Sequence, residues 1–284
     1  MKTNESFPKN VEILKDYWNS EKSSRIGAKR RMELYGPPGT PEGRKRGGHM
    51  SQIKRRAYPE RYPQCNLSKN YSFPEKSEQL AELVGIILGD GGITNDQVRV
   101  TLNKETEIEY IDFVANLLKK LFNEEAKIYQ YSNPKVKVCN LAFSGVALVD
   151  YLAEIGIYKG NKVARQASVP KWVAQNKGYS LACLRGLIDT DGGVYYHKHS
   201  SGGYNYFNLG LTFTNASLPL VDFVHETLIS LGFTSKKKPR GVFLYRQDEV
   251  VRYMQIVKSN NLHHVKRFKE FFDRKKQEGS HSLV

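Results

Sequence analysis

The period of the apolar positions changes regularly along the chain from about Ser77 onward. Apolar residues first recur at helical spacing up to Gly91, and residues 98–103 then alternate apolar and polar, as a half-buried strand does. The rest of this half continues in the same way. We expect further helices over 108–122 and 146–155, and further strands over 126–131 and 136–143.

The same order of elements recurs about one hundred residues later. We expect helices over 181–191, 220–231 and 248–258, and strands over 194–199, 204–214 and on both sides of Pro239-Arg240-Gly241. A duplication this regular predicts an α+β fold of two tandem αββαββα units, each with an antiparallel sheet. We place the units at 75–169 and 178–274, joined by a linker at 170–177 and followed by a C-terminal tail at 275–284.

A short motif ends the first helix of each unit. Leu83–Gly91 reads LVGIILGDG, and Leu184–Gly192 reads LRGLIDTDG. Each holds small residues four positions apart, which share a helix face and let two backbones approach closely. If the two helices pack on each other, Asp90 and Asp191 meet at their carboxyl ends. Carbonyl dipoles and like charge oppose two anions there, so the arrangement predicts a bound divalent cation.

The charge of the chain is strongly unbalanced. The net charge is +15, of which residues 1–74 contribute +9. Such a surplus indicates a polyanionic partner, and the 17 tyrosines favour nucleic acid over a membrane surface. No apolar run reaches the roughly 18 residues that span a bilayer. The three cysteines lack metal-ligand spacing, so we expect a cytoplasmic, disulfide-free protein.

Residues 1–74 form a basic extension to the duplicated units. Two short helical patterns within 10–35 suggest a helix-turn-helix-like module, and a Gly- and Pro-rich basic stretch follows from Gly36. We expect this stretch to be an arm that follows phosphates or lies in the minor groove; a disordered tail is the alternative. Its candidate DNA contacts are Arg44, Lys45, Arg46, Lys54, Arg55 and Arg56.

The predicted strands carry long hydrogen-bond donors and aromatic residues on their polar faces. Such side chains suit groove edges and phosphates, and the scarcity of acids favours DNA over an ordinary solvated sheet face. The first sheet would present Gln97, Arg99, Thr101, Asn103, Lys127, Tyr129, Lys135 and Lys137. The second would present His197, His199, Tyr204, Tyr206, Asn208, Lys236, Lys238, Arg240 and Arg246.

On its two motifs and its repeated order of elements, the chain resembles the LAGLIDADG homing endonucleases over about residues 77–272. The resemblance implies that the last acids, Asp90 and Asp191, are catalytic. It also implies two sheets that form a saddle over DNA and cleavage of both strands across the minor groove, leaving 3′ overhangs. The first motif has Leu88 where many members have an acid, whereas the second keeps Asp189; this position is not the catalytic one.

The resemblance further implies a divalent metal, Mg²⁺ or Mn²⁺, with Ca²⁺ supporting binding without cleavage. We take Gly89 and Thr190, which precede the acids, as further metal-site candidates. Members of the family also place a basic residue after the last helix of each domain. Lys162 matches in the first half, and His263 and Lys266 compete for the role in the second.

Sequence reasoning leaves two other functions on the same fold. One is an RNA-binding maturase that helps its host intron to splice, and the other is a DNA-binding regulator without catalysis. For the endonuclease we expect a monomer bound to a long, asymmetric double-stranded DNA site. We expect it in the cytoplasm or an organelle, associated with DNA and not with a membrane.

Overall fold

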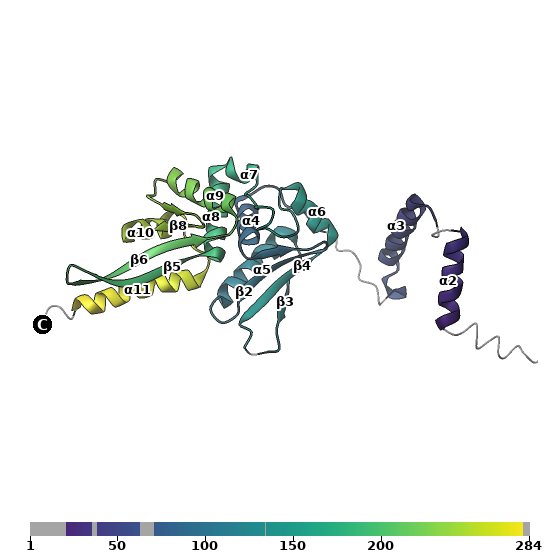
Figure 1. Cartoon of the computed structure of the whole chain (residues 1–284), viewed down its shortest axis with the longest axis horizontal. Coiled ribbons are helices and arrows are strands. Elements are labelled where there is room, and N and C mark those ends of the chain that lie inside the picture. The colour runs from purple at the N-terminus through teal and green to yellow at the C-terminus, as the bar shows by residue number, and fades with distance from the viewer. Residues whose placement is uncertain (1–20, 36–38, 63–70, 134, 281–284) are drawn as a thin grey trace, which may run out of the picture. The chain divides into compact units, whose positions relative to one another are not determined.

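The structure is a computed structural model that describes residues 21–35, 39–62, 71–133 and 135–280 (Figure 1). The chain divides into two compact units, residues 1–68 and residues 69–284. The duplicated part of the sequence lies entirely in the second of these units.

The N-terminal unit contains helices α2 (Glu21–Tyr35) and α3 (Pro41–Ala57) and a short 3-10 turn, η1 (Pro59–Arg61). Thr40 caps α3, because its Oγ1 accepts a hydrogen bond from the Gly43 amide over 3.0 Å. The alternative of a disordered tail is therefore wrong over the length of α3, where the basic stretch is helical. The first of the two helical patterns, near residues 11–18, lies outside the described residues.

The first half of the second unit follows the predicted order of elements. Its strands pair antiparallel in the order β1-β2-β4-β3. The elements are α4 (Glu78–Gly89), β1 (Gly91–Ile93), β2 (Gln97–Asn103), α5 (Ile108–Phe122), β3 (Lys127–Gln130), β4 (Val138–Ser144) and α6 (Val146–Glu154).

The second half repeats this arrangement, with strand order β5-β6-β8-β7, and confirms the predicted duplication. Its elements are α7 (Lys171–Ala174), α8 (Lys177–Asp191), β5 (Gly192–Ser201), β6 (Tyr204–Thr214), α9 (Leu218–Ser230), β7 (Lys236–Lys238), β8 (Gly241–Leu244), α10 (Gln247–Ile256) and α11 (Leu262–Ser280). Two helices were not predicted. Helix α7 lies in the expected linker, and α11 continues to Ser280, through the first residues of the expected C-terminal tail.

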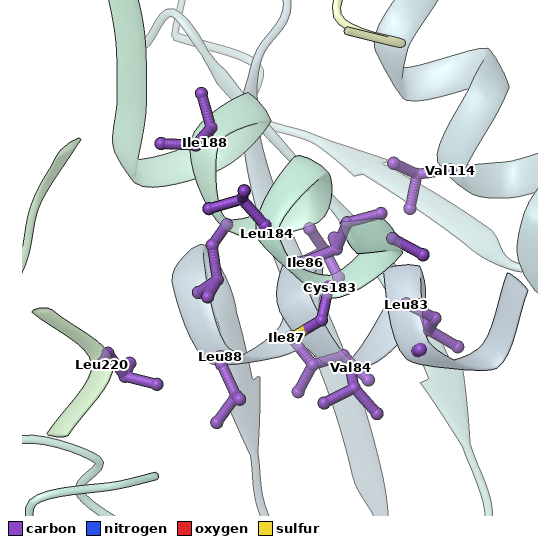
Figure 2. Packing of buried hydrophobic residues seen from close by; sticks show 14 of the residues in the cluster. Leu83, Val84, Ile86, Ile87, Leu88, Val114, Cys183, Leu184, Ile188 and Leu220 are labelled. Atoms are coloured by element: carbon purple, nitrogen blue, oxygen red, sulfur yellow. The ribbon is translucent and has the colours of Figure 1, made fainter. Parts of the chain in front are cut away.

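Helices α4 and α8 lie against each other at the centre of the second unit (Figure 2). A Cβ atom at Gly85 would collide with the backbone carbonyl of Cys183, and one at Gly186 would collide with that of Glu82. The two glycines thus let the helix backbones touch in a two-fold-like manner, as the motifs predict. Buried Leu83 and Leu184 extend the contact into the core.

The remaining sequence expectations concern cysteines and membranes. Cys139 and Cys183 are buried free thiols, whereas Cys65 lies outside the described residues. In the described parts of the chain, no helix combines the length and apolarity that a membrane crossing requires.

Candidate active site

Asp90 and Asp191 stand at the carboxyl ends of the two central helices. Asp90 is the C-cap of α4, and Asp191 is the last residue of α8. Between them, Gly89 faces the second motif: a Cβ built on Gly89 would lie 3.5 Å from Oδ2 of Asp191 and would collide with the side chain of Thr190. The close packing of the helices therefore brings the two acids into one site.

The two carboxyl groups lie in an unfavourable place for negative charge. Burial, followed by the nearby charges of Asp191 and Glu107, raises the pKa of Asp90 to about 7, although Lys162 opposes this. Burial also raises the pKa of Asp191, against the effects of Lys162 and of a hydrogen bond from Asn215. At neutral pH the pair attracts protons or other cations.

Lys162 supplies one such cation. Its Nζ donates to the backbone carbonyls of Ile87 (3.1 Å), Leu88 (2.9 Å) and Gly89, at the end of α4. Burial lowers the pKa of this ammonium group, while Asp191 and Asp90 raise it. The structure therefore places the predicted lysine beside both acids. Its positive charge also interacts favourably with the partial negative charge at the carboxyl end of α4.

The two candidates for a second basic residue lie on helix α11. Lys266 forms an ion pair with Glu109 of α5 over 2.6 Å, at the protein surface. His263 is half-buried, and burial lowers its pKa. Both follow α10, the helix that matches α6, but they lie on the additional helix α11, which begins at Leu262.

Sequence reasoning did not predict a buried polar cluster next to the acids. The Asp189 carboxylate is fully buried and accepts hydrogen bonds from Ser259 Oγ (2.6 Å), Asn260 N (2.8 Å) and Asn261 N (3.3 Å). The Asn261 side chain in turn donates to Glu107 (2.8 Å) and to the Asp189 carbonyl (2.9 Å). The one available signal was the acid at motif position six, present only in the second motif.

A second buried contact joins the two halves. Arg185 of α8 forms a two-pronged ion pair with Glu82 of α4, at 2.9 and 2.7 Å, and also donates to the Val257 carbonyl over 3.1 Å. Asn260 donates to the same Glu82 carboxylate over 2.5 Å. The segment between α10 and α11 is thereby tied to both central helices.

Residues 178–270 match the family model described as a LAGLIDADG-like domain. The resemblance predicted from the motifs is thus confirmed over this range, and the first half repeats its order of elements and its strand order.

Several solved structures are similar to this chain over about three quarters of its length. The LAGLIDADG meganuclease I-AabMI bound to uncleaved DNA shares 12% identity, with a TM-score of 0.46 over 72% of this chain and 92% of that one. The homing endonuclease I-SmaMI bound to cleaved DNA shares 12% identity, with a TM-score of 0.46 over 75% of this chain and 93% of that one. Full-length WhiA from Thermatoga maritima shares 11% identity, with a TM-score of 0.45 over 72% of this chain and 63% of that one.

Four of the residues predicted for the polar face of the first sheet lie on strand β2, whereas Lys135 and Lys137 precede strand β4, which begins at Val138, so the expectation that they lie in this sheet is wrong. Along β2, Arg99 and Thr101 are exposed between buried apolar neighbours, and Tyr129 pairs in register with Asn140, which is opposite Thr101. Lys137 forms an ion pair with Glu105 over 2.9 Å. A hollow of about 210 Å³ opens on the first sheet, lined by Gln97, Arg99, Tyr129, Gln130, Tyr131 and Asn140.

The strands of the second sheet contain most of the residues predicted to contact DNA, and Arg240 lies between β7 and β8. His197 pairs with Asn208 and His199 with Tyr206, while Lys236 and Lys238 lie on the short edge strand β7. Arg246 departs from this pattern. It is the N-cap residue of α10 and forms an ion pair with the nearby Asp248 over 2.7 Å.

The predicted basic contacts of the extension all lie on α3 in the N-terminal unit. Helix α3 has no buried residue. Its basic side chains are therefore exposed on a helix, and their contact with phosphates stays a prediction.

Proposed function

We propose that the chain is a metal-dependent endonuclease that cuts both strands of double-stranded DNA at a long, asymmetric site. The observation that carries this proposal is the joint placement of Asp90, Asp191 and Lys162 at the ends of the paired helices. Burial and mutual repulsion of two carboxylates both cost stability, so a purely structural role does not explain the pair. They suit a site that collects cations beside a phosphodiester.

The residues at this site fit a hard divalent cation. Carboxylate oxygens are preferred ligands of Mg²⁺ and Mn²⁺, and Mg²⁺ is commonly held by one or two carboxylates together with phosphates and water. Within the described residues, no group of three or more His, Cys, Asp or Glu could hold a metal ion. Asp90 and Asp191, next to Gly89 and Thr190, would therefore hold a metal whose other ligands come from DNA and water.

Each side chain of the site has a distinct part in hydrolysis. A bound divalent ion would activate water and stabilise charge on the reacting phosphate. Lys162 would offset the negative charge of the acids and of the phosphate while remaining fixed to the end of α4. Asn215, through its bond to Oδ2, would keep Asp191 ionised and correctly oriented.

The two polar sheet faces and helix α3 would supply DNA binding. Arg, Lys, Gln and Asn at alternating strand positions suit base edges and phosphates, and the surplus positive charge suits the backbone. We infer that one chain suffices, because both halves of the site belong to it. Cleavage across the minor groove with 3′ overhangs is the outcome expected from the family resemblance.

One experiment tests the proposal and its two alternatives together. The purified chain is incubated with a randomised duplex library and Mg²⁺, and the ends are sequenced. We expect a unique cut site with 3′ overhangs, lost in Asp90→Asn and Asp191→Asn, both of which still bind that site in Ca²⁺. Specific duplex binding without cleavage by the unaltered chain would favour a regulator, and selective binding of structured RNA would favour a maturase.

A further inference from the structure

Ser217 occupies the N-cap position of helix α9, but its hydroxyl group bonds elsewhere. A serine at this position usually accepts a hydrogen bond from an amide of the first helical turn. Within the described residues, the Ser217 side chain makes no such bond. Its Oγ donates instead to the backbone carbonyl of Ala167, over 2.6 Å and 50 positions away in the sequence. Both residues are buried, so this bond lies in the interior of the fold.

The start of α9 is bonded instead by a side chain from the segment that follows the first half. Gln166 accepts a hydrogen bond from the Leu218 amide (2.9 Å) and donates one to the Ala216 carbonyl (3.3 Å). Its backbone has a φ of 50°, a left-handed conformation that residues other than glycine adopt uncommonly and at some cost. Ser217 and Gln166 thus form a contact of three hydrogen bonds with distant parts of the chain, which we term the latch.

The latch joins the two sides of the candidate active site. On one side, the Ala167 amide donates to the backbone carbonyl of Lys162 (2.9 Å), whose Nζ reaches the end of α4. On the other side, the Ser217 amide donates to Oδ1 of Asn215 (2.7 Å), and the side-chain nitrogen of Asn215 donates to Asp191. A continuous series of hydrogen bonds therefore runs from Lys162 through the latch to Asp191.

The place of Lys162 depends on a loop. Helix α6 ends at Glu154 and α7 begins at Lys171, so the backbone of Lys162 belongs to neither helix. A lysine carries its charge on a flexible four-carbon stem, and the loop beneath that stem must therefore be fixed if the charge is to be fixed. The first half holds the loop through the Gly160 amide, which donates to the Ile93 carbonyl over 3.2 Å. The latch holds the other end of the same loop.

We propose that the latch formed by Ser217 and Gln166 positions Lys162 against the carboxyl end of α4; this inference rests on the proposed function. Both are positioning residues, because they act on the site through the loop that carries Lys162. While the latch is closed, the ammonium group stays within hydrogen-bond distance of the α4 carbonyls. When the latch is opened, the loop can move away from α4 and takes the charge with it.

Two variants open the latch. Ser217→Ala removes the bond to Ala167, and Gln166→Ala removes the two bonds to the start of α9. Ser230→Ala is the matched control, because Ser230 also belongs to α9 but its Oγ donates within that helix, to the Thr227 carbonyl over 2.8 Å.

Two measurements on these variants test the proposal. Labelling by an amine-reactive reagent, followed by mass spectrometry, reports the accessibility of Lys162 without any need for cleavage, and the exposed Lys159 of the same loop is the internal reference. We expect several-fold faster labelling of Lys162 in both latch variants and the wild-type rate in Ser230→Ala. Single-turnover cleavage of saturating duplex in Mg²⁺ should slow by about 10- to 100-fold in both latch variants, because small displacements of a group at the reacting centre are costly. Duplex affinity in Ca²⁺ should stay the same.

Each outcome bears on a separate claim. A wild-type chain that cuts no duplex would overturn the proposed function, and the labelling of Lys162 would still test the latch. Labelling of Lys162 at the wild-type rate in both latch variants would overturn the latch, and so would cleavage as fast as that of Ser230→Ala. A loss of duplex affinity large enough to explain the slower cleavage would do the same. Because Gln166 is exposed, Gln166→Ala alone decides if Ser217→Ala does not fold.

Discussion

The side-chain amide of Asn215 donates to Oδ2 of Asp191 over 2.6 Å, at the point where strand β6 has just ended. This bond favours the ionised form of Asp191. Burial, together with the nearby charges of Asp191 and Glu107, instead raises the pKa of Asp90 to about 7. The two acids of the site are therefore not equivalent, despite the symmetry of the motifs that carry them.

Asn215→Ala should impair cleavage more at pH 6 than at pH 8. Without the donor, the pKa of Asp191 rises further, so less of the carboxylate is ionised in mildly acidic solution. A hydrogen bond to a charged group contributes about 1.5–3 kcal/mol, which corresponds to a loss of roughly 10- to 100-fold. Single-turnover rates across this pH range measure the effect. Asn116→Ala, at an exposed position of α5, is the control, and an equal loss at both pH values would contradict the explanation.

Asp90→Asn should stabilise the fold at pH 8 in the absence of divalent cations. The folded-state pKa of Asp90 is about 7, above its ordinary value of 3.8, so the folded protein binds the extra proton between these values. Stability from this group is complete below pH 4 and is lost as the pH rises through 7. The full difference corresponds to about 4 kcal/mol.

Urea unfolding of the wild type and Asp90→Asn at pH 4.5 and pH 8 measures this difference. The variant should be more stable at pH 8, and its advantage should shrink at pH 4.5. Mg²⁺ should stabilise the wild type but not the variant. Asp150→Asn, at an exposed position of α6, is the control. A variant less stable than the wild type at pH 8 would show that the ionised carboxylate of Asp90 does not destabilise the fold.

Gly186→Ala should destabilise the second unit by several kcal/mol. The added methyl group would collide with the carbonyl of Glu82 on the facing helix, and two packed backbones cannot yield as a flexible side chain can. Gly85→Ala should have a similar effect against Cys183. Gly92→Ala is the matched control, because no atom lies within 4 Å of a Cβ at that position. Equal midpoints of thermal unfolding for all three variants would refute the close helix contact.

The repeated part of the fold could be predicted from the sequence because each element carries its own periodic signal. Val98, Val100 and Leu102 alternate with polar neighbours, and the predicted strand is β2. The two glycine-containing motifs likewise indicated which helix faces touch. Local patterns sufficed wherever one face of an element is buried and the other is not.

The parts that could not be predicted depend on contacts distant in sequence. Asn215 and Asn261 are ordinary polar residues until the fold brings them to Asp191 and Asp189, 24 and 72 positions away. Helix α3 contains Pro41, Gly47 and Gly48, a composition typical of loops, yet Thr40 caps it and Pro41 occupies its first turn. The N-terminal cap therefore favours a helix in this segment more than its glycine and proline content disfavours one.

Glu82→Ala should lower the stability of the fold more than replacement of both partners of its ion pair does. The single change leaves the Arg185 guanidinium partly buried without its carboxylate, a situation that costs about 3–5 kcal/mol. The double replacement Glu82→Met with Arg185→Met removes both charges and keeps the volume, so it should recover much of the stability. Urea unfolding of the three variants measures this. A double variant as unstable as Glu82→Ala would show that the pair is needed for more than charge balance.

Neutralising the basic end of helix α3 should reduce the salt dependence of DNA binding. In a variant with Lys54, Arg55 and Arg56 replaced by glutamine, up to three phosphate contacts are lost. The slope of log K against log salt should therefore become shallower by about 3. Binding of the selected duplex is measured in Ca²⁺ from low to high salt. Lys119→Gln with Lys120→Gln, on the outer face of α5, should leave the slope unchanged. An unaltered slope in the α3 variant would show that this helix does not contact DNA.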